Sequence, residues 1–107
     1  MISPISPAKT PAPPYYAVIF TSIRLPGDNG YAEMANVMEA LAAKQPGFLG
    51  FETARQEIGI SVSYWTDLAA IQAWKNNVEH QQAQKKAKQW YQTFRVRVCR
   101  VEKEYGF

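Results

Sequence analysis

The sequence is poor in the residues that most often form disulfides and metal sites. Among its 107 residues are one cysteine and one histidine. Cys99 has no partner for an internal disulfide, and no CxxC motif or histidine-rich segment beside it indicates zinc. These absences favour a reducing compartment and predict no metal site.

Long apolar runs are also missing. Prolines interrupt the N-terminal stretch, where a signal peptide needs a continuous apolar run, and no other segment approaches membrane-spanning length. The net charge is only +3, and the basic residues are scattered apart from short groups at 85–88 and 95–100. We therefore expect a soluble cytoplasmic protein with no membrane or nucleic-acid partner.

The N-terminal segment, residues 1–14, differs in composition from residues 15–107. Its prolines remove backbone donors and favour extended conformations. They are Pro4, Pro7, Pro11, Pro13 and Pro14. The whole chain has 107 residues, of which 47% are apolar. This suits one domain with one core, and the chain is too short for two. We expect an arm followed by a single small domain.

Hydrophobic patterns predict alternating strands and helices in the domain. Residues 15–24 are rich in aromatic and β-branched side chains and predict a strand, and residues 31–45 have the apolar spacing of a helix. Two further strand-like runs, 48–55 and 58–65, predict a hairpin. The C-terminal run, residues 95–105, predicts a last strand.

The second helix is expected to be interrupted. Thr66 and Asp67 resemble an N-cap, so a helix should begin there. Asn76 and Glu79 have the spacing of a capping box, which predicts a break and then a longer helix to about Tyr91. In the last strand, the alternation slips between Val98 and Cys99, which predicts a β-bulge.

The second strand of the hairpin presents two different faces, because successive strand side chains point in opposite directions. One face carries Ile58, Ile60, Val62 and Tyr64, and the other carries Gly59, Ser61, Ser63 and Trp65. We expect the first face to pack against helices and the second to line a polar or half-open cavity.

The predicted order β-α-β-β-α-β is the split ferredoxin-like arrangement, an α+β fold with helices on one face of an antiparallel sheet. The other face then needs cover. We expect the region of Phe20, Phe51 and Trp65 to meet a second copy, related by a two-fold axis, so that two sheets close into a barrel.

One turn and one long segment carry a family pattern. Its parts are the turn QPGFLGFE at 45–52, Ser63–Trp65 at a strand end, Ile71 and Trp74 on a helix, Glu79–His80 with Ala83–Gln84, Trp90–Tyr91, and the strand at 95–98. This pattern resembles the antibiotic biosynthesis monooxygenase family. The resemblance covers residues 15–102 and leaves out the arm.

The resemblance implies a homodimeric α+β barrel with a pocket in each subunit, bounded by the sheet and the second helix. Characterised members oxidise aromatic polyketides or quinols with molecular oxygen and without metal or flavin. It therefore implies a cofactor-independent monooxygenase acting on a small aromatic, polyketide or quinol-like substrate. A non-catalytic dimeric module that binds small ligands is an alternative, because the fold alone does not determine function.

A haem-binding and haem-degrading branch of the family gives another alternative. The resemblance implies an axial histidine about three turns beyond the tryptophan matched by Trp74, where this sequence has Gln84. An amide is a poor iron ligand, and His80 lies one turn earlier. A haem-binding and haem-degrading monooxygenase is therefore the second hypothesis for the function.

His80 is the candidate catalytic base or proton relay. Oxygenation without a cofactor needs a base to make the substrate an electron-rich anion, and His80 is the only side chain with an unperturbed pKa near neutrality. The alternative is a structural histidine on the packed face of its helix.

The candidates for substrate binding are Trp65, Ser63, Ser61, Arg97, Tyr91 and Trp74. An indole ring beside small residues would leave room for a stacked planar substrate. Trp74 shares a helical stripe with Ile71, so core packing is its alternative role. Arg97 would hold an anionic oxygen if its face lines the barrel, or else would protect an edge strand from aggregation.

Overall fold

Four strands and three helices follow one another in the computed structural model, which describes residues 6–80 and 86–107, with no side-chain detail for Glu79 and His80. The elements are β1 (Tyr15–Arg24), α1 (Tyr31–Ala43), β2 (Phe48–Arg55), β3 (Gly59–Trp65), α2 (Leu68–His80), α3 (Ala87–Trp90) and β4 (Tyr91–Val101). The expected strands of the hairpin are confirmed to within one residue.

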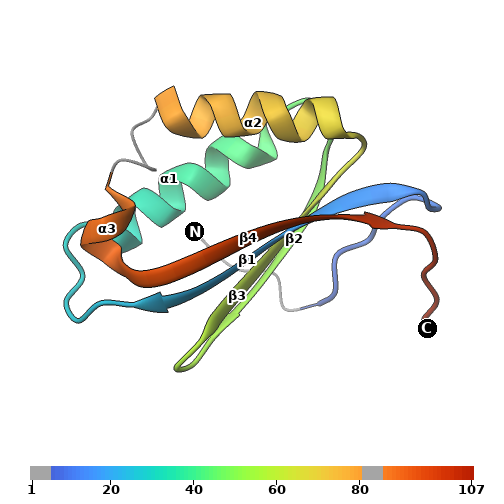
Figure 1. The fold of residues 1–107 in the computed structure, drawn as a ribbon. Helices are drawn as coiled ribbons and strands as arrows, with labels where there is room; N and C mark the ends of the chain where they lie inside the picture. The colour runs from blue at the N-terminus through green and yellow to red at the C-terminus, as the bar shows by residue number, and fades with distance from the viewer. Residues whose placement is uncertain (1–5, 81–85) are drawn as a thin grey trace.

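The strands form one antiparallel sheet in the order β2-β3-β1-β4. Helices α1 and α2 lie together over one side of this sheet, and α3 lies where β1 ends and β4 begins (Figure 1). The α+β, ferredoxin-like fold class is therefore confirmed.

The strand register aligns the side chains of the helix-facing side in rows across β2, β3, β1 and β4. Successive rows are Phe48, Trp65, Tyr16 and Arg100; Phe51, Ser63, Val18 and Val98; Thr53, Ser61, Phe20 and Val96; and Arg55, Gly59, Ser22 and Phe94. Trp65 stacks on Trp74 of α2, which identifies this side as the one that the helices cover.

The expected roles of the two faces of β3 are wrong. Ile60 and Val62 lie on the outer side, away from the helices, and Ile60 is 44% exposed. Trp65 is fully buried under α2, since its large ring offers the helix more apolar surface than the isoleucines do. For the same reason the region of Phe20, Phe51 and Trp65 is not the outer surface that needs a second copy.

The predicted break in the second helix is also wrong. Helix α2 continues without interruption to His80, and the Nε2 amide of Gln72 donates to Oδ1 of Asn76 over 3.1 Å. This bond engages the Asn76 side chain one turn back, so it caps no new helix. The expected cap at the start is confirmed, because the Ala70 N–H donates to Oδ1 of Asp67 over 2.8 Å. Ala83 and Gln84, which are part of the family pattern, lie outside the described residues.

The last strand pairs regularly with β1 through Val98 and Cys99, so the bulge predicted there is wrong. The register instead shifts where Ile23 pairs with Thr93 and Arg24 pairs with Tyr91, which leaves Gln92 as the extra residue. The slip in apolar alternation between Val98 and Cys99 therefore does not come from a bulge. Cys99 lies on the outer side beside Ala17, at the end of the sheet that the N-terminal arm covers.

The arm, described from residue 6, runs along the outer side of the sheet, opposite α1 and α2 (Figure 1). The Ala8 N–H donates to Oε2 of Glu52 over 2.8 Å, and the Thr10 hydroxyl donates to the Tyr15 hydroxyl over 3.0 Å. Tyr15, on this outer side, is accordingly only 4% exposed. The arm is therefore part of the folded structure.

Candidate functional site

Trp65, Ser63 and Trp74 come together at one end of the helix-facing side. The indole N–H of Trp65 donates to Oγ of Ser63 over 2.9 Å, and the Trp65 ring packs edge-on against Phe48 at 5.4 Å. With Trp74 on its other side, Trp65 is 0% exposed. A ligand that touches the Trp65 ring must therefore displace one of these neighbours.

Ser61 lies in the middle of the same side, between Thr53 and Phe20. Its hydroxyl and that of Thr53 form a hydrogen bond of 2.9 Å. Ser61 and Ser63 have small side chains, so they fill little of the space between this part of the sheet and the helices. The small residues predicted to border a cavity therefore face the helix layer and not the outer side.

Tyr91 lies at the other end of the helix-facing side, at the junction of α3 and β4. Its ring packs edge-on against Phe20 at 5.3 Å and against Tyr31 of α1 at 5.6 Å. Burial raises the pKa of Tyr91 above its ordinary value, and the neighbouring Tyr31 hydroxyl adds to the effect. The phenol is therefore protonated at neutral pH and is able to donate a hydrogen bond.

Arg55 is close to this end, and the sequence reasoning did not identify it. Its guanidinium donates to Oγ and to the carbonyl oxygen of Ser22, which is 2% exposed. Gly59 lies between them on β3, and a Cβ there would overlap the guanidinium. A glycine inside a strand pattern indicates close approach by another group, and that was the available signal.

A second guanidinium fixes the aromatic neighbours. Arg24 lies over the Tyr31 ring, with 3.5 Å from its Cζ to the ring centroid. Its Nε–H donates to the Trp90 carbonyl over 2.9 Å, and the Trp90 indole N–H donates to the Asn29 carbonyl over 3.0 Å. These contacts join the start of α1 to α3 and so hold Tyr31 against Tyr91.

Arg97 lies on the outer side of the sheet, so the structure does not bring it together with the other candidates. Together with Arg95 it borders a pocket of about 210 Å³ whose other walls include Thr21, Ile23 and Ile58. The sheet separates this pocket from Trp65. A substrate held by Arg97 would therefore not contact Ser61 or Ser63, whereas Ser22 also borders this pocket.

His80 is the last residue of α2. Its side chain falls outside the described part of the structure, so its role as a base stays a prediction. Within residues 6–78 and 86–107, no cluster of three potential metal ligands occurs. None of the described helices has the length and apolar character that crossing a membrane requires.

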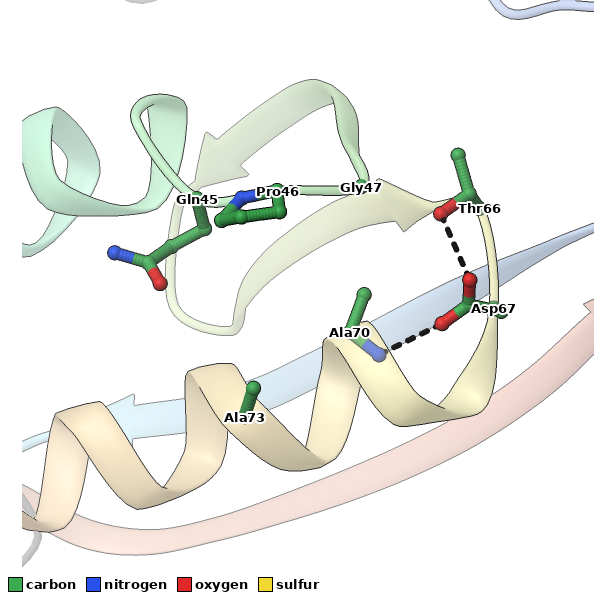
Figure 2. Close-up of a pocket in the computed structure, with 7 residues that line it drawn as sticks. All are labelled: Gln45, Pro46, Gly47, Thr66, Asp67, Ala70 and Ala73. Atoms are coloured by element: carbon green, nitrogen blue, oxygen red, sulfur yellow. Dashed lines mark hydrogen bonds between the residues drawn. The ribbon is translucent and has the colours of Figure 1, made fainter.

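Figure 2 shows another pocket, of about 220 Å³, between the turn after α1 and the first turns of α2. The Thr66 N–H donates to the Gly47 carbonyl over 2.8 Å, and Asp67 is the helix cap. Ala70 and Ala73 form the floor. The carboxylate that lines this pocket is that of Asp67, and it caps α2. The pocket is therefore better explained as a packing contact between the turn and α2 than as a reaction site.

The fold and the aromatic helix-facing side define a small ferredoxin-like α+β protein. The family model for antibiotic biosynthesis monooxygenase matches residues 31–86. The chain is also 49% identical over 103 residues to the uncharacterized protein YqjZ of Bacillus subtilis (strain 168), with 94% of this chain and 90% of that protein covered. The chain therefore belongs to the antibiotic biosynthesis monooxygenase family.

Solved structures share the fold at low sequence identity. SnoaB of Streptomyces nogalater, described as a cofactor-independent oxygenase, superposes with a TM-score of 0.72 at 12% identity, covering 86% of this chain and 97% of that one. The NE2512 protein of Nitrosomonas europaea, of unknown function, gives a TM-score of 0.70 at 14% identity, with 86% and 93% covered.

Proposed function

We propose that this protein is a monooxygenase that acts without a bound cofactor on a small aromatic, polyketide or quinol-like substrate. The observation that carries the proposal is membership of the antibiotic biosynthesis monooxygenase family. The fold shared with SnoaB, a cofactor-independent oxygenase, adds support. The aromatic side chains that line one end of the helix-facing side suit a planar substrate.

The chemistry requires little beyond a base and a pocket that stabilises an anion. Deprotonation makes an anthrone or hydroquinone electron-rich enough to pass an electron to molecular oxygen. With an anthrone, the methylene carbon becomes a carbonyl carbon bearing one atom of O₂, and the other atom leaves as water with both methylene hydrogens. The protein would contribute proton transfer and a fixed hydrogen-bond donor.

Within this proposal, His80 removes the proton and Tyr91 is a donor to the substrate oxygen. His80 lies at the end of α2, and the pKa of Tyr91 is raised by burial, so the phenol keeps its proton where an imidazole base works. Ser61, Ser63, Trp65, Trp74 and Arg97 remain candidates for substrate contact.

We also propose that the working unit is a homodimer. The arm covers one end of the outer side, while Ile23 and Ile60 remain exposed on the uncovered part. An apolar sheet surface of this kind is usually covered in a protein this small. Light scattering should give twice the monomer mass at micromolar concentration, and a stable monomer would contradict the dimer.

Oxygen consumption tests the activity directly. Purified protein is incubated with an anthrone and with a series of hydroquinones, with and without a chelator, and product is analysed after reaction in ¹⁸O₂. We expect uptake that the chelator leaves unchanged, one labelled oxygen atom in the anthrone product, and a loss of about 100-fold in kcat for His80→Ala. Gln72→Ala, also on α2, is the control and should retain activity.

Uptake no faster than in buffer, for every substrate, would reject the monooxygenase. A hemin titration separates the haem alternative, since a Soret shift that disappears in His80→Ala would support haem binding instead. Unchanged activity in His80→Ala would remove His80 from the mechanism without rejecting the activity.

A further inference from the structure

Arg55 is held in one position by contacts that cross the sheet. Its side chain begins on β2, passes over Gly59 of β3 and reaches Ser22 of β1, which is almost fully buried. The contact with Ser22 joins residues 33 positions apart in the sequence. A guanidinium fixed in this way loses less conformational entropy when a ligand binds than a free arginine does.

The Arg55 guanidinium has donors to spare. It carries five N–H groups, of which the two hydrogen bonds to Ser22 use only part. The Arg55 side chain is exposed, and among the side chains that the structure describes, no carboxylate forms an ion pair with it. A fixed positive charge with free donors favours an anionic ligand.

Aromatic surface lies directly beside this charge. Phe94 is the residue opposite Ser22 on β4, and its ring stacks on Phe20 with centroids 5.3 Å apart and planes 22° from parallel. Tyr91 packs edge-on against both rings. Phe94 is nonetheless 42% exposed, so part of an aromatic face is open to a ligand next to the guanidinium.

The hydroxyl of Tyr91 is influenced by the same charge. The positive charges of Arg55 and Arg24 oppose the rise in the pKa of Tyr91 that burial produces, so both guanidinium groups lie within electrostatic range of that phenol. The phenol nevertheless stays protonated, because burial dominates. This end of the helix-facing side therefore carries one neutral donor, the Tyr91 phenol, and one charged donor, the Arg55 guanidinium.

We propose that Arg55, held by Ser22 and Gly59, binds the deprotonated oxygen of a planar phenolic substrate whose ring lies on Phe94 beside Tyr91. This assignment rests on the proposed monooxygenase function and narrows its substrate class. The preferred substrates are phenols that are acidic enough to form their anion near neutral pH. Neutral aromatic compounds of the same size bind more weakly, because they leave the guanidinium unpaired.

Binding of 4-nitrophenol tests this site without any need for turnover. Calorimetric titration is done at mildly alkaline pH, where the probe is an anion, and 4-nitroanisole, which cannot ionise, is the control ligand. We expect the wild-type protein to bind the phenolate at least 10-fold more tightly than the anisole. Arg55→Gln should lose about 10- to 100-fold in affinity for the phenolate and little for the anisole.

Three further variants make the test more specific. Gly59→Ala displaces the guanidinium without removing its charge and should lower phenolate affinity in the same direction. Arg100→Gln removes an exposed guanidinium at the far end of β4, opposite Tyr16, and should leave phenolate affinity unchanged. Circular dichroism confirms that each variant is folded. Arg55→Lys keeps a charge and measures the contribution of the planar guanidinium.

The site would be overturned by equal phenolate affinity in wild type and Arg55→Gln, by absence of phenolate binding in the wild type, or by loss in Arg100→Gln alone. These outcomes are distinct from failure of the proposed function. Protein that binds phenolate through Arg55 but consumes no oxygen with any substrate rejects the monooxygenase and keeps the site. Oxygen uptake that is indifferent to Arg55→Gln rejects the site alone.

Discussion

Trp65 and Trp74 stack with ring centroids 6.1 Å apart and ring planes 26° from parallel. This contact fastens α2 to the end of β3 and closes that end of the helix-facing side. From Trp65 to Gly59 along β3 is about 20 Å, at a rise of about 3.4 Å per residue. Closed packing and open aromatic surface therefore occupy opposite ends of one side of the sheet.

The tryptophan stack predicts a large stability effect at Trp65. Trp65→Ala removes a ring that is fully buried, and should lower the free energy of unfolding by about 3–5 kcal/mol. Urea denaturation followed by circular dichroism measures the change. Tyr105→Ala, at an aromatic side chain that is 92% exposed, is the control and should change stability by less than about 0.5 kcal/mol. Similar losses in both variants would contradict this role of Trp65.

Two glycines with nearly equal positive φ angles separate backbone strain from steric overlap. Gly47 and Gly30 have φ angles of 85° and 83°, so an alanine at either position costs about 1–2 kcal/mol. A Cβ at Gly47 would also lie 2.7 Å from both Ala70 Cβ and Thr66 Oγ1, whereas a Cβ at Gly30 meets nothing within 4 Å. Gly47→Ala should therefore be more destabilising than Gly30→Ala in thermal denaturation. Equal melting temperatures would show that the turn yields to the added methyl group.

The sequence alone predicts the element order well, because each element has its own local signal. The strand at 15–24 and the Asp67 cap follow from β-branched residues and from side-chain chemistry beside the helix start. Asn76 shows the limit of local signals. Its capping-box spacing competes with a side-chain bond to Gln72 in an unbroken helix, and the outcome depends on how α2 packs.

Other features were beyond the sequence because they depend on contacts between distant segments. Alternation along β3 defines two faces but does not say which one a helix covers, and the fit of Trp65 against Trp74 decides that. Arg55 is placed at the site by its hydrogen bond to Ser22, which lies on a strand that is remote in the sequence. Tyr91 was a candidate from sequence, but its aromatic neighbours are set by the sheet register.

Alkaline pH should destabilise the protein through Tyr64. Burial, and then its hydrogen bond to Glu52, raise the pKa of Tyr64 above the ordinary value of 10.0. The folded chain thus holds the phenolic proton more tightly than the unfolded chain. The resulting stability is fully present below about pH 10 and is lost as the pH rises toward the higher folded-state value.

Urea denaturation at increasing pH measures this loss, and Tyr64→Phe should show a shallower decrease. Burial also contributes to raised pKa values for Tyr15 and Tyr91, so some decrease remains in this variant. Tyr105→Phe, at an exposed tyrosine, is the control and should follow the wild type. A Tyr64→Phe profile as steep as that of the wild type would contradict the assignment.

Glu52 should govern how firmly the arm is held. Its carboxylate accepts hydrogen bonds from the Ala8 N–H over 2.8 Å and from the Tyr64 hydroxyl. Bonds to a charged acceptor contribute about 1.5–3 kcal/mol, so Glu52→Ala should speed amide exchange at Ala8 by about 10- to 100-fold. Hydrogen exchange followed by mass spectrometry of peptides covering residues 6–14 gives the rate.

Gly50→Ala tests the same attachment by another route, because a Cβ there would lie 2.9 Å from Ala8 Cβ and would push the arm outward. Glu57→Gln, at an exposed carboxylate in the hairpin turn, is the matched control and should not change the rate. Faster exchange in both Glu52→Ala and Gly50→Ala, with global stability little changed, would show that the arm detaches locally. Unchanged exchange in both variants would mean that Thr10 and Glu104 hold the arm without help from Glu52.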